Sequence, residues 1–310
     1  PSTDTHRSPG VGRELIVRQD GQDGAFATLQ DAFDSAQPGD HILVHDERIT
    51  GALRVDKPNI RIDSAIPGRR VIWSASTNPE GSLLSVNRAA NFHLKGFMLD
   101  GGQHLADLVT ISGLCPGLVL DDVQLQGFTR AAIALADARG KPGDDLQLLN
   151  LKIVATAGKT AGTGLLISGE DGDHLFVEGS RFDGPMQSAL QIAGWIQNSE
   201  VRGCQISKMD TALRYGFSVP RHTIGLQWID NRFTEVKTAL WFDAWPIADS
   251  GSSLVLRGNM FSRTGALVHM EPNAVKDKPN QKLFAGSSDN KRDAVTKPDT
   301  FLPTTLSTQH

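Results

Sequence analysis

The side chains best suited to chemistry in this sequence follow short apolar segments late in the chain. Gln191, Arg214, Trp241 and Asp243 each come directly after an apolar residue of such a segment. An exposed tryptophan offers its ring face to the C–H groups of a sugar, and the arginine fork pairs with a carboxylate. These residue types favour a surface that binds carbohydrate. The competing interpretation is that the aromatic side chains pack long turns against the core.

Residues of the neighbouring turns widen the candidate set. The candidate substrate-binding residues are Gln191, Trp195, Arg214, Arg221, Trp241 and Trp245. The candidate catalytic residues are Arg214, as a proton acceptor, together with Asp243 and His222. Hydrolysis of a glycosidic bond generally uses two carboxyl groups on one face, and Asp243 is the only acid that the pattern places there. Which residues would catalyse a reaction is therefore unknown from the sequence.

Acidic residues are too scattered to predict a metal site. A calcium-dependent lyase needs several clustered acids around the ion. Asp100 and Asp183 occupy matching positions of the repeat described below, but Gln126 and Val154 stand between them. We therefore expect no cofactor, and calcium is the one ion left open.

An internal repeat between about residues 82 and 270 must position these side chains. Each repeat has a strand of the type Ala-Leu-x-apolar, a turn, and the unit apolar-x-apolar-x-(Gly/Asp/Asn)-x-x-apolar. The middle column of that unit holds Gly96, Asp122, Asn150, Gly179, Gly203, Asp230 and Gly258. All seven are residue types that tolerate a positive φ. The unit therefore predicts two short strands bent at one left-handed residue.

Short, β-branched or aromatic segments interrupted by glycine exclude a solenoid of helical repeats. They predict an all-β fold, a parallel β-helix with three strands per coil and about 4.8 Å between coils. The residues expected to point outward from the first strands are Ser85, Thr110, Ala134, Leu166, Gln191, Arg214, Trp241 and Val268, and two residues later Asp243 and Met270. Cys115 and Cys204 fall on different coils, beyond the reach of a disulfide.

The N-terminal part of the chain predicts a cap. Leu29, Ala32 and Phe33 have helical spacing, with Thr28 as the N-cap and Asp31 three residues later. A short helix over about 28–36 would cover the open end of the first coil. We expect a flexible segment over 1–13, one β-helix domain over 14–271, and a polar tail or linker over 272–310. That tail is either docked on the coils or disordered.

The stretch FATLQDAFDSAQPGDHILVHDERITGALRVDKPNIRI resembles the N-terminal cap and first coil of right-handed, pectate-lyase-like β-helix proteins. The later coils resemble the same superfamily, so the resemblance covers about residues 14–270. Its members include polyuronate lyases, glycoside hydrolases, epimerases and non-catalytic modules, whose sites usually lie over the first strand of each coil. The chain is also similar to extracytoplasmic β-helix regions of some bacterial kinase-like membrane proteins, although it has no kinase motif.

Charge and hydropathy limit the classes of partner that the chain is expected to bind. Lys and Arg number 31 against 35 Asp and Glu, a net charge of −4 that does not draw the chain to nucleic acid or anionic lipid. No apolar run of about 18 residues is present, so we expect no membrane insertion by this segment. Polysaccharides and cell-surface proteins remain as partners.

Three functions are compatible with these observations. The favoured one is a non-catalytic module, periplasmic, cell-surface or secreted, that binds a carbohydrate or a protein along its side. The first alternative is a lyase, hydrolase or epimerase acting on a uronate-containing polysaccharide. The second is a structural spacer or sensor region of a larger, membrane-anchored chain.

Overall fold

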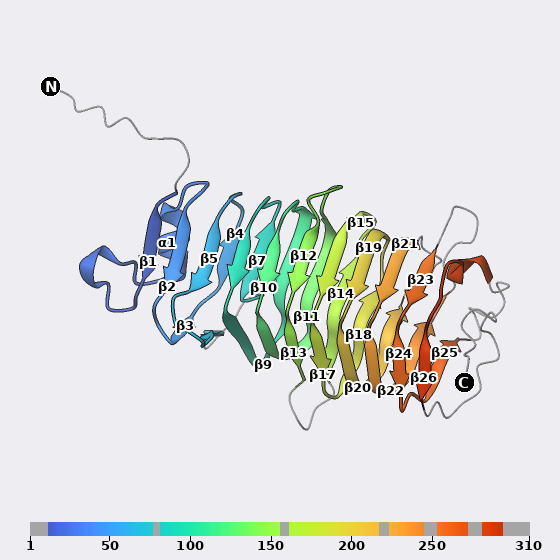
Figure 1. Ribbon diagram of the computed structural model, residues 1–310. Coiled ribbons are helices and arrows are strands. Elements are labelled where there is room, and N and C mark those ends of the chain that lie inside the picture. Colours follow the sequence, from blue (N-terminus) through green and yellow to red (C-terminus); the bar gives the residue numbers. More distant parts are fainter. Residues whose placement is uncertain are drawn as a thin grey trace.

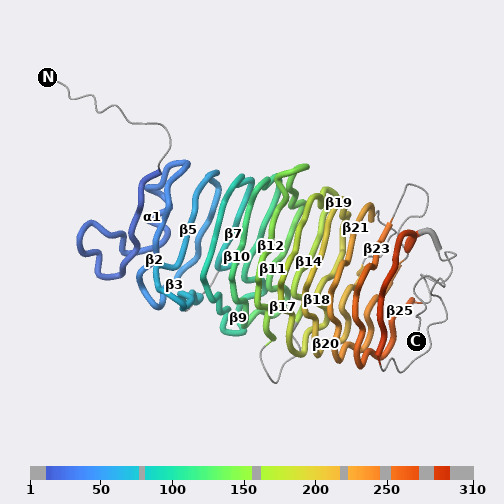
Figure 2. Tube along the Cα trace, viewed as in Figure 1, coloured from blue at the N-terminus to red at the C-terminus, as the bar shows by residue number. Residues whose placement is uncertain are grey.

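The protein winds into a stack of short strands along one axis, from the blue coils at one end to the red coils at the other (Figures 1 and 2). The computed structural model describes residues 12–76, 81–155, 161–216, 223–244, 253–271 and 281–293. Within these ranges the strand pairs are parallel and connect each coil to the next. The predicted all-β, parallel β-helix is confirmed.

Three ladders of paired strands form the three faces, called sheets 1, 2 and 3. Sheet 1 holds β1 (Glu14–Val17), β2 (His41–Val44), β5 (Arg61–Ser64), β8 (His93–Lys95), β10 (Val119–Asp121), β12 (Leu146–Leu149), β16 (Leu175–Glu178), β19 (Ile196–Arg202), β21 (Thr223–Ile229) and β23 (Leu254–Arg257). Sheet 2 holds β3 (Arg48–Thr50), β6 (Val71–Ser74), β13 (Lys152–Val154), β17 (Arg181–Asp183), β24 (Met260–Ser262) and β26 (Lys291–Asp293). Sheet 3 holds β4 (Leu53–Val55), β7 (Leu84–Asn87), β14 (Ala161–Ser168), β18 (Met186–Ile192) and β25 (Ala266–Met270).

Four long strands run through sheet 2 and continue into sheet 3. They are β9 (Phe97–Leu114), β11 (Gln124–Arg139), β20 (Gln205–Tyr215) and β22 (Arg232–Phe242). The two-residue strand β15 (Gly172–Asp173) pairs with β11 and β19 in the turn from sheet 3 to sheet 1. The helical elements are η1 (Gln22–Gly24), α1 (Leu29–Ser35) and η2 (Gln281–Phe284).

The turn from sheet 1 to sheet 2 is made at the predicted column of bend residues. All seven have a positive φ, between 52° at Asp122 and 80° at Gly96. Asp289, with φ of 59°, continues the column on the last described coil. This confirms that the Gly, Asn and Asp residues mark the left-handed bend.

Apolar side chains fill the interior in rows that run along the axis. The row three residues after the bend holds Leu99, Leu125, Ile153, Phe182, Ile206, Phe233 and Phe261, each at most 3% exposed. The rings of Phe233 and Phe261 stack with centroids 4.6 Å apart and planes 9° apart. Each such buried side chain contributes about 1.5–3 kcal/mol through removal of apolar surface from water.

A ladder of buried asparagines follows the bend on the late coils. Asn231 accepts a hydrogen bond from the Cys204 N–H (2.9 Å) and donates its amide to the Val201 carbonyl (2.9 Å). Its backbone N–H donates to Asn259 Oδ1, and Asn259 repeats the arrangement with Asn290. Asn231, Asn259 and Asn290 therefore stack on three successive coils.

The cap forms as its sequence signals predict. In α1 the Thr28 hydroxyl accepts a hydrogen bond from the Asp31 N–H at 3.1 Å, while Leu29, Ala32 and Phe33 are buried. The ammonium of Lys57 donates to three carbonyls at the other end of the helix, where the helix dipole favours a cation. Packing of α1 on β1, β2 and β4 covers the first coil (Figure 1).

Parallel pairing continues beyond residue 271 at the other end. β26 pairs with β24, and Leu283 and Phe284 of η2 are buried against the last coils. Residues 1–11 of the expected flexible segment and residues 294–310 of the expected tail lie outside the described residues.

Both cysteines are buried free thiols rather than a disulfide. Burial raises the pKa of Cys204 to about 12, and it raises the pKa of Cys115 as well. In the part of the chain that the structure describes, no helix is long and apolar enough to cross a membrane.

Substitutions at the bend residue Gly203 should destabilise the protein to different degrees. Its φ is 60° and nothing lies within 4 Å of an added Cβ. Because space is available, the cost of a side chain there is the cost of its left-handed backbone alone. Gly203→Val should lower the free energy of unfolding by about 1–2 kcal/mol more than Gly203→Asn. Urea unfolding of the two variants checks this, and equal losses would contradict it.

The asparagine ladder predicts a larger loss for Asn231→Ala. The substitution leaves the Cys204 N–H and the Val201 carbonyl buried without their partner, which should cost about 2–4 kcal/mol of unfolding free energy. The control is Asn150→Gly, because Asn150 is an exposed bend residue and glycine accepts its φ of 52°. Chemical denaturation should show the control within about 1 kcal/mol of wild type.

Candidate functional site

The outward side of sheet 3 carries one row of candidate residues on successive late coils. Gln191 of β18 pairs with Arg214 of β20, which pairs with Trp241 of β22. Each follows a buried leucine, at positions 190, 213 and 240, so alternation along the strand turns it outward. The structure thus places these three residues side by side, where the repeat predicted them.

The next coil differs from the prediction by one residue. Trp241 pairs with His269 and Phe242 pairs with Met270, so the expectation that Val268 and Met270 point outward is wrong. The cause is the consecutive apolar run Ala266, Leu267, Val268, which lacks the alternation that sets the phase of a strand. A one-residue shift exchanges the two faces, and it brings His269 into the outward row.

The same shift brings a second acid to this face. The Glu271 N–H donates to the Phe242 carbonyl at 3.0 Å, so Glu271 lies on the coil next to Asp243. The sequence pattern missed His269 and Glu271. The sequence did contain one warning: a run of consecutive apolar residues does not show which of them point inward.

Asp243 joins Arg214 and Trp241 into one rigid group. Arg214 donates from Nε to Asp243 Oδ2 at 3.1 Å and from Nη2 to Oδ1 at 3.2 Å. The Trp241 indole N–H donates to the same Oδ1 at 2.8 Å. The guanidinium carbon lies 5.8 Å from the Trp241 ring centroid, within the range of a cation–π contact.

His269 extends this group by one coil. Its ring lies on Trp241 with centroids 3.9 Å apart and planes inclined by 35°. His269 Nε2 is 3.5 Å from Glu271 Oε1, and the two side chains are 43% and 40% exposed. An aromatic platform with a cation on one side and an acid on the other therefore faces solvent.

Side chains behind and beside the platform hold it in place. Tyr215 and Phe242, the buried residues next to Arg214 and Trp241, stack with centroids 4.8 Å apart. Burial raises the pKa of Tyr215 far above its usual value, so the phenol stays neutral. Gln191 accepts a hydrogen bond from Thr163 at 3.2 Å, and a Cβ at Gly216 would come within 2.6 Å of the Gln191 amide nitrogen.

The geometry gives Asp243 a positioning role. Both of its oxygens already accept hydrogen bonds from Arg214 or Trp241. A carboxylate used in this way orients the two side chains that would contact a sugar. Glu271 is the more exposed acid on this face, at 40% against 25% for Asp243.

The remaining candidates are placed less closely or not at all. Trp195 lies in the turn after β18, where its backbone N–H donates to the Gly169 carbonyl at 2.9 Å. Arg221, His222 and Trp245 lie outside the described residues.

Among the described residues, no group of three or more His, Cys, Asp or Glu side chains could hold a metal ion. Asp100, Gln126, Val154 and Asp183 are in register, but they lie on sheet 2 rather than beside Arg214. The described residues of sheet 3 therefore offer no set of ligands for a calcium ion.

The fold comparison agrees with a right-handed parallel β-helix. The alginate lyase from Paenibacillus sp. str. FPU-7 is similar with a TM-score of 0.59 and 14% identity, over 92% of this chain and 99% of the lyase. The polygalacturonase from Erwinia carotovora ssp. carotovora is similar with a TM-score of 0.50 and 11% identity, over 94% and 98% of the two chains.

A third similar structure is a virus protein, ORF18 of Geobacillus virus E2. It has a TM-score of 0.50 and 10% identity, and the match covers 90% of this chain but 59% of the viral one. No protein-family profile and no curated protein matches the sequence. At these identities the comparisons establish the fold alone.

Proposed function

We propose that this protein is a non-catalytic, extracytoplasmic β-helix module that binds an acidic polysaccharide across the late coils of sheet 3. The observation that carries the proposal is the group formed by Arg214, Trp241 and His269. It combines the two aromatic rings of His269 and Trp241, inclined to each other by 35°, with a fixed guanidinium on an exposed face. A sugar ring stacks on the first, and a sugar carboxylate pairs with the second.

The hydrogen bonds of Asp243 support binding rather than catalysis. They hold the Arg214 fork and the Trp241 indole before any ligand arrives, so little side-chain entropy is lost on binding. The same bonds occupy the oxygens that an acid or base catalyst would need.

The fold supports the class of ligand. An alginate lyase and a polygalacturonase share the architecture, and the resemblance of the first coil to pectate-lyase-like proteins agrees with them. An acidic polysaccharide is met outside the cytoplasm, which is the reason for the proposed location. A protein partner on the same face, or a spacer within a larger chain, is what remains if no polysaccharide binds.

Trp241→Ala should weaken binding of polygalacturonate or alginate at least about tenfold, because it removes the stacking face and one partner of Asp243. Isothermal titration calorimetry on both polymers and on neutral dextran measures this. The matched control is Phe176→Ala, since Phe176 lies on sheet 1 with the Arg202 guanidinium 5.9 Å from its ring centroid. The control should bind as wild type, and equal losses in the two variants would refute a sheet 3 site.

A second function is favoured by one observation, the position of Glu271 on the coil next to Asp243, with His269 close to Glu271. Most glycoside hydrolases use two neighbouring carboxyl groups for catalysis. Under this alternative Glu271 gives a proton to the leaving oxygen of the sugar or takes one from the ring carbon, His269 orients Glu271, and Arg214 holds the substrate carboxylate. The protein would then be a lyase, hydrolase or epimerase acting on a uronate polymer.

Turnover on neutral and uronic polysaccharides, with and without calcium, distinguishes the two functions. We expect no new reducing ends and no unsaturated products. If product forms, Glu271→Gln should lower the rate by about 10²–10⁴-fold, as for loss of an acid–base group. Glu178→Gln, an exposed glutamate on sheet 1, is the control that should keep the full rate.

A further inference from the structure

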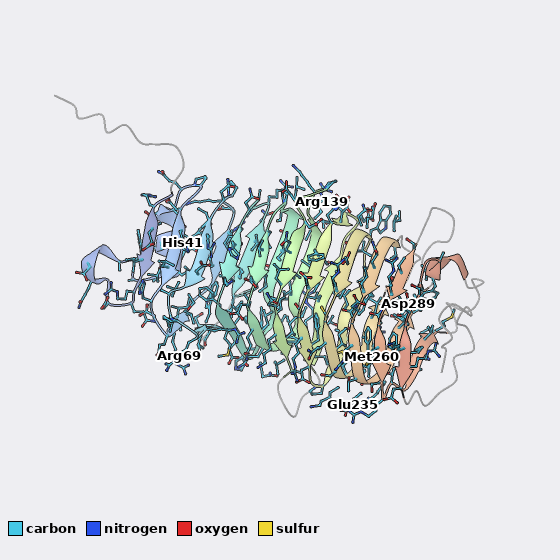
Figure 3. All side chains as sticks on the ribbon, in the orientation of Figure 1. His41, Arg69, Arg139, Glu235, Met260 and Asp289 are labelled. Atoms are coloured by element: carbon cyan, nitrogen blue, oxygen red, sulfur yellow. The ribbon has the colours of Figure 1, made fainter. Side chains whose placement is uncertain are left out.

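A second lateral surface lies on sheet 2, separate from the platform on sheet 3. There β17, β20, β22 and β24 follow one another along the late coils (Figure 1). A groove of about 240 Å³ runs over them, with Arg181 and Arg232 on one side and Lys208 and Arg263 on the other. Figure 3 labels Glu235 and Met260, which mark the late-coil end of this face.

The groove has a polar floor between its two basic sides. Ser207 and Thr234 pair across β20 and β22 and line its base. Lys208 and Arg263 stand at bends with φ of 58° and 51°, directly after the strands of sheet 2. The bends therefore put one basic side at the edge of the sheet, while the strand residues form the other.

Two of the four cations already have a carboxylate partner. Arg181 pairs with Asp183 at 2.8 Å, and Arg263 pairs with Glu235 at 2.8 Å. Burial alone would raise the pKa of Asp183, but its hydrogen bonds with Arg181 and Ser207 hold that pKa below the usual value. These pairs keep both arginines extended along the groove.

Arg232 and Lys208 form no ion pair with any described residue. Four cations against two carboxylates leave an excess of two positive charges on this face, whereas the whole chain has a net charge of −4. A local excess of this sign in an acidic protein concentrates an anion at the surface.

The basic row extends beyond the groove at both ends. Lys152 pairs with Arg181 on the preceding coil, and Lys291 follows Met260 on the last described coil. From Lys152 to Lys291 the row crosses five coil intervals of about 4.8 Å, or about 24 Å in all. A row of this length fits a linear polymer with repeated negative charges better than a small anion.

We propose that this groove is a second binding surface for an acidic polysaccharide chain lying parallel to the coil axis. Arg232 and Lys208 take its carboxylate or sulfate groups. The Ser207 and Thr234 hydroxyls and the Glu235 carboxylate take hydrogen bonds from its hydroxyl groups. Single-stranded nucleic acid fits less well, because none of the described residues that line the groove is aromatic and could stack a base, and the acids there repel phosphate.

The test compares two double variants of the full chain. Lys208→Asn/Arg232→Gln removes the two unpaired cations, with asparagine chosen because it tolerates the positive φ at position 208. Lys141→Gln/Arg257→Gln removes two exposed cations from other faces as the matched control. Affinity for polygalacturonate and for heparin is measured by calorimetry between low and physiological salt.

The groove variant should bind about 5- to 10-fold more weakly than wild type at low salt, with a shallower dependence on salt, and the control should match wild type. Trp241→Ala should weaken only the sheet 3 site, the groove variant only the sheet 2 site, and the combined variant both, as expected of two independent surfaces.

Three results would overturn the proposal. One is no loss in the groove variant, including no binding of either polymer by wild type. Another is an equal loss in the control, which would indicate only general charge attraction. The third is tighter binding of oligo(dT) than of polygalacturonate.

Discussion

From Gly96 to Asp289, each coil turns from sheet 1 to sheet 2 through a single residue with positive φ, and the rest of the structure depends on that constraint. A one-residue bend fixes the number of residues between the two strands. Each strand therefore enters sheet 2 with its side chains alternating inward and outward in the same order as in the neighbouring coil. Equal phase stacks like residues on like, which produces the phenylalanine row inside and the asparagine ladder beside it. It also aligns the outward residues, so both candidate surfaces follow from the regularity of the bends.

The two surfaces use that alignment in different ways. On sheet 3 an acid ties Arg214 and Trp241 together, and the result is a compact platform with one fixed cation. On sheet 2 the cations are spread over successive coils with two of them unpaired. We propose that the first arrangement binds a sugar ring, whereas the second binds the repeated charges of a linear chain. Both agree with a linear acidic sugar polymer as the ligand.

The sequence predicted most of the scaffold because its signals are local. The seven bend residues and the α1 cap with Thr28 and Asp31 each depend on residue type and spacing alone. The phase of β25 could not be predicted, because Ala266, Leu267 and Val268 are all apolar and only pairing with β22 decides which faces inward. His269 and Glu271 were missed for that reason. The bonds from Arg214 to Asp243 were also beyond prediction, since the two residues are 29 positions apart.

Parallel coils also determine how the chain can assemble. Every coil contacts the coil made about 25 residues earlier, so contacts form in sequence order as the polypeptide emerges from the ribosome. The α1 helix is made before any complete coil and gives the first coil a finished surface on which to form. Coils are then added in one direction, each on the surface of the preceding coil. The late coils, which carry both candidate surfaces, are completed last and rest on everything synthesised before them.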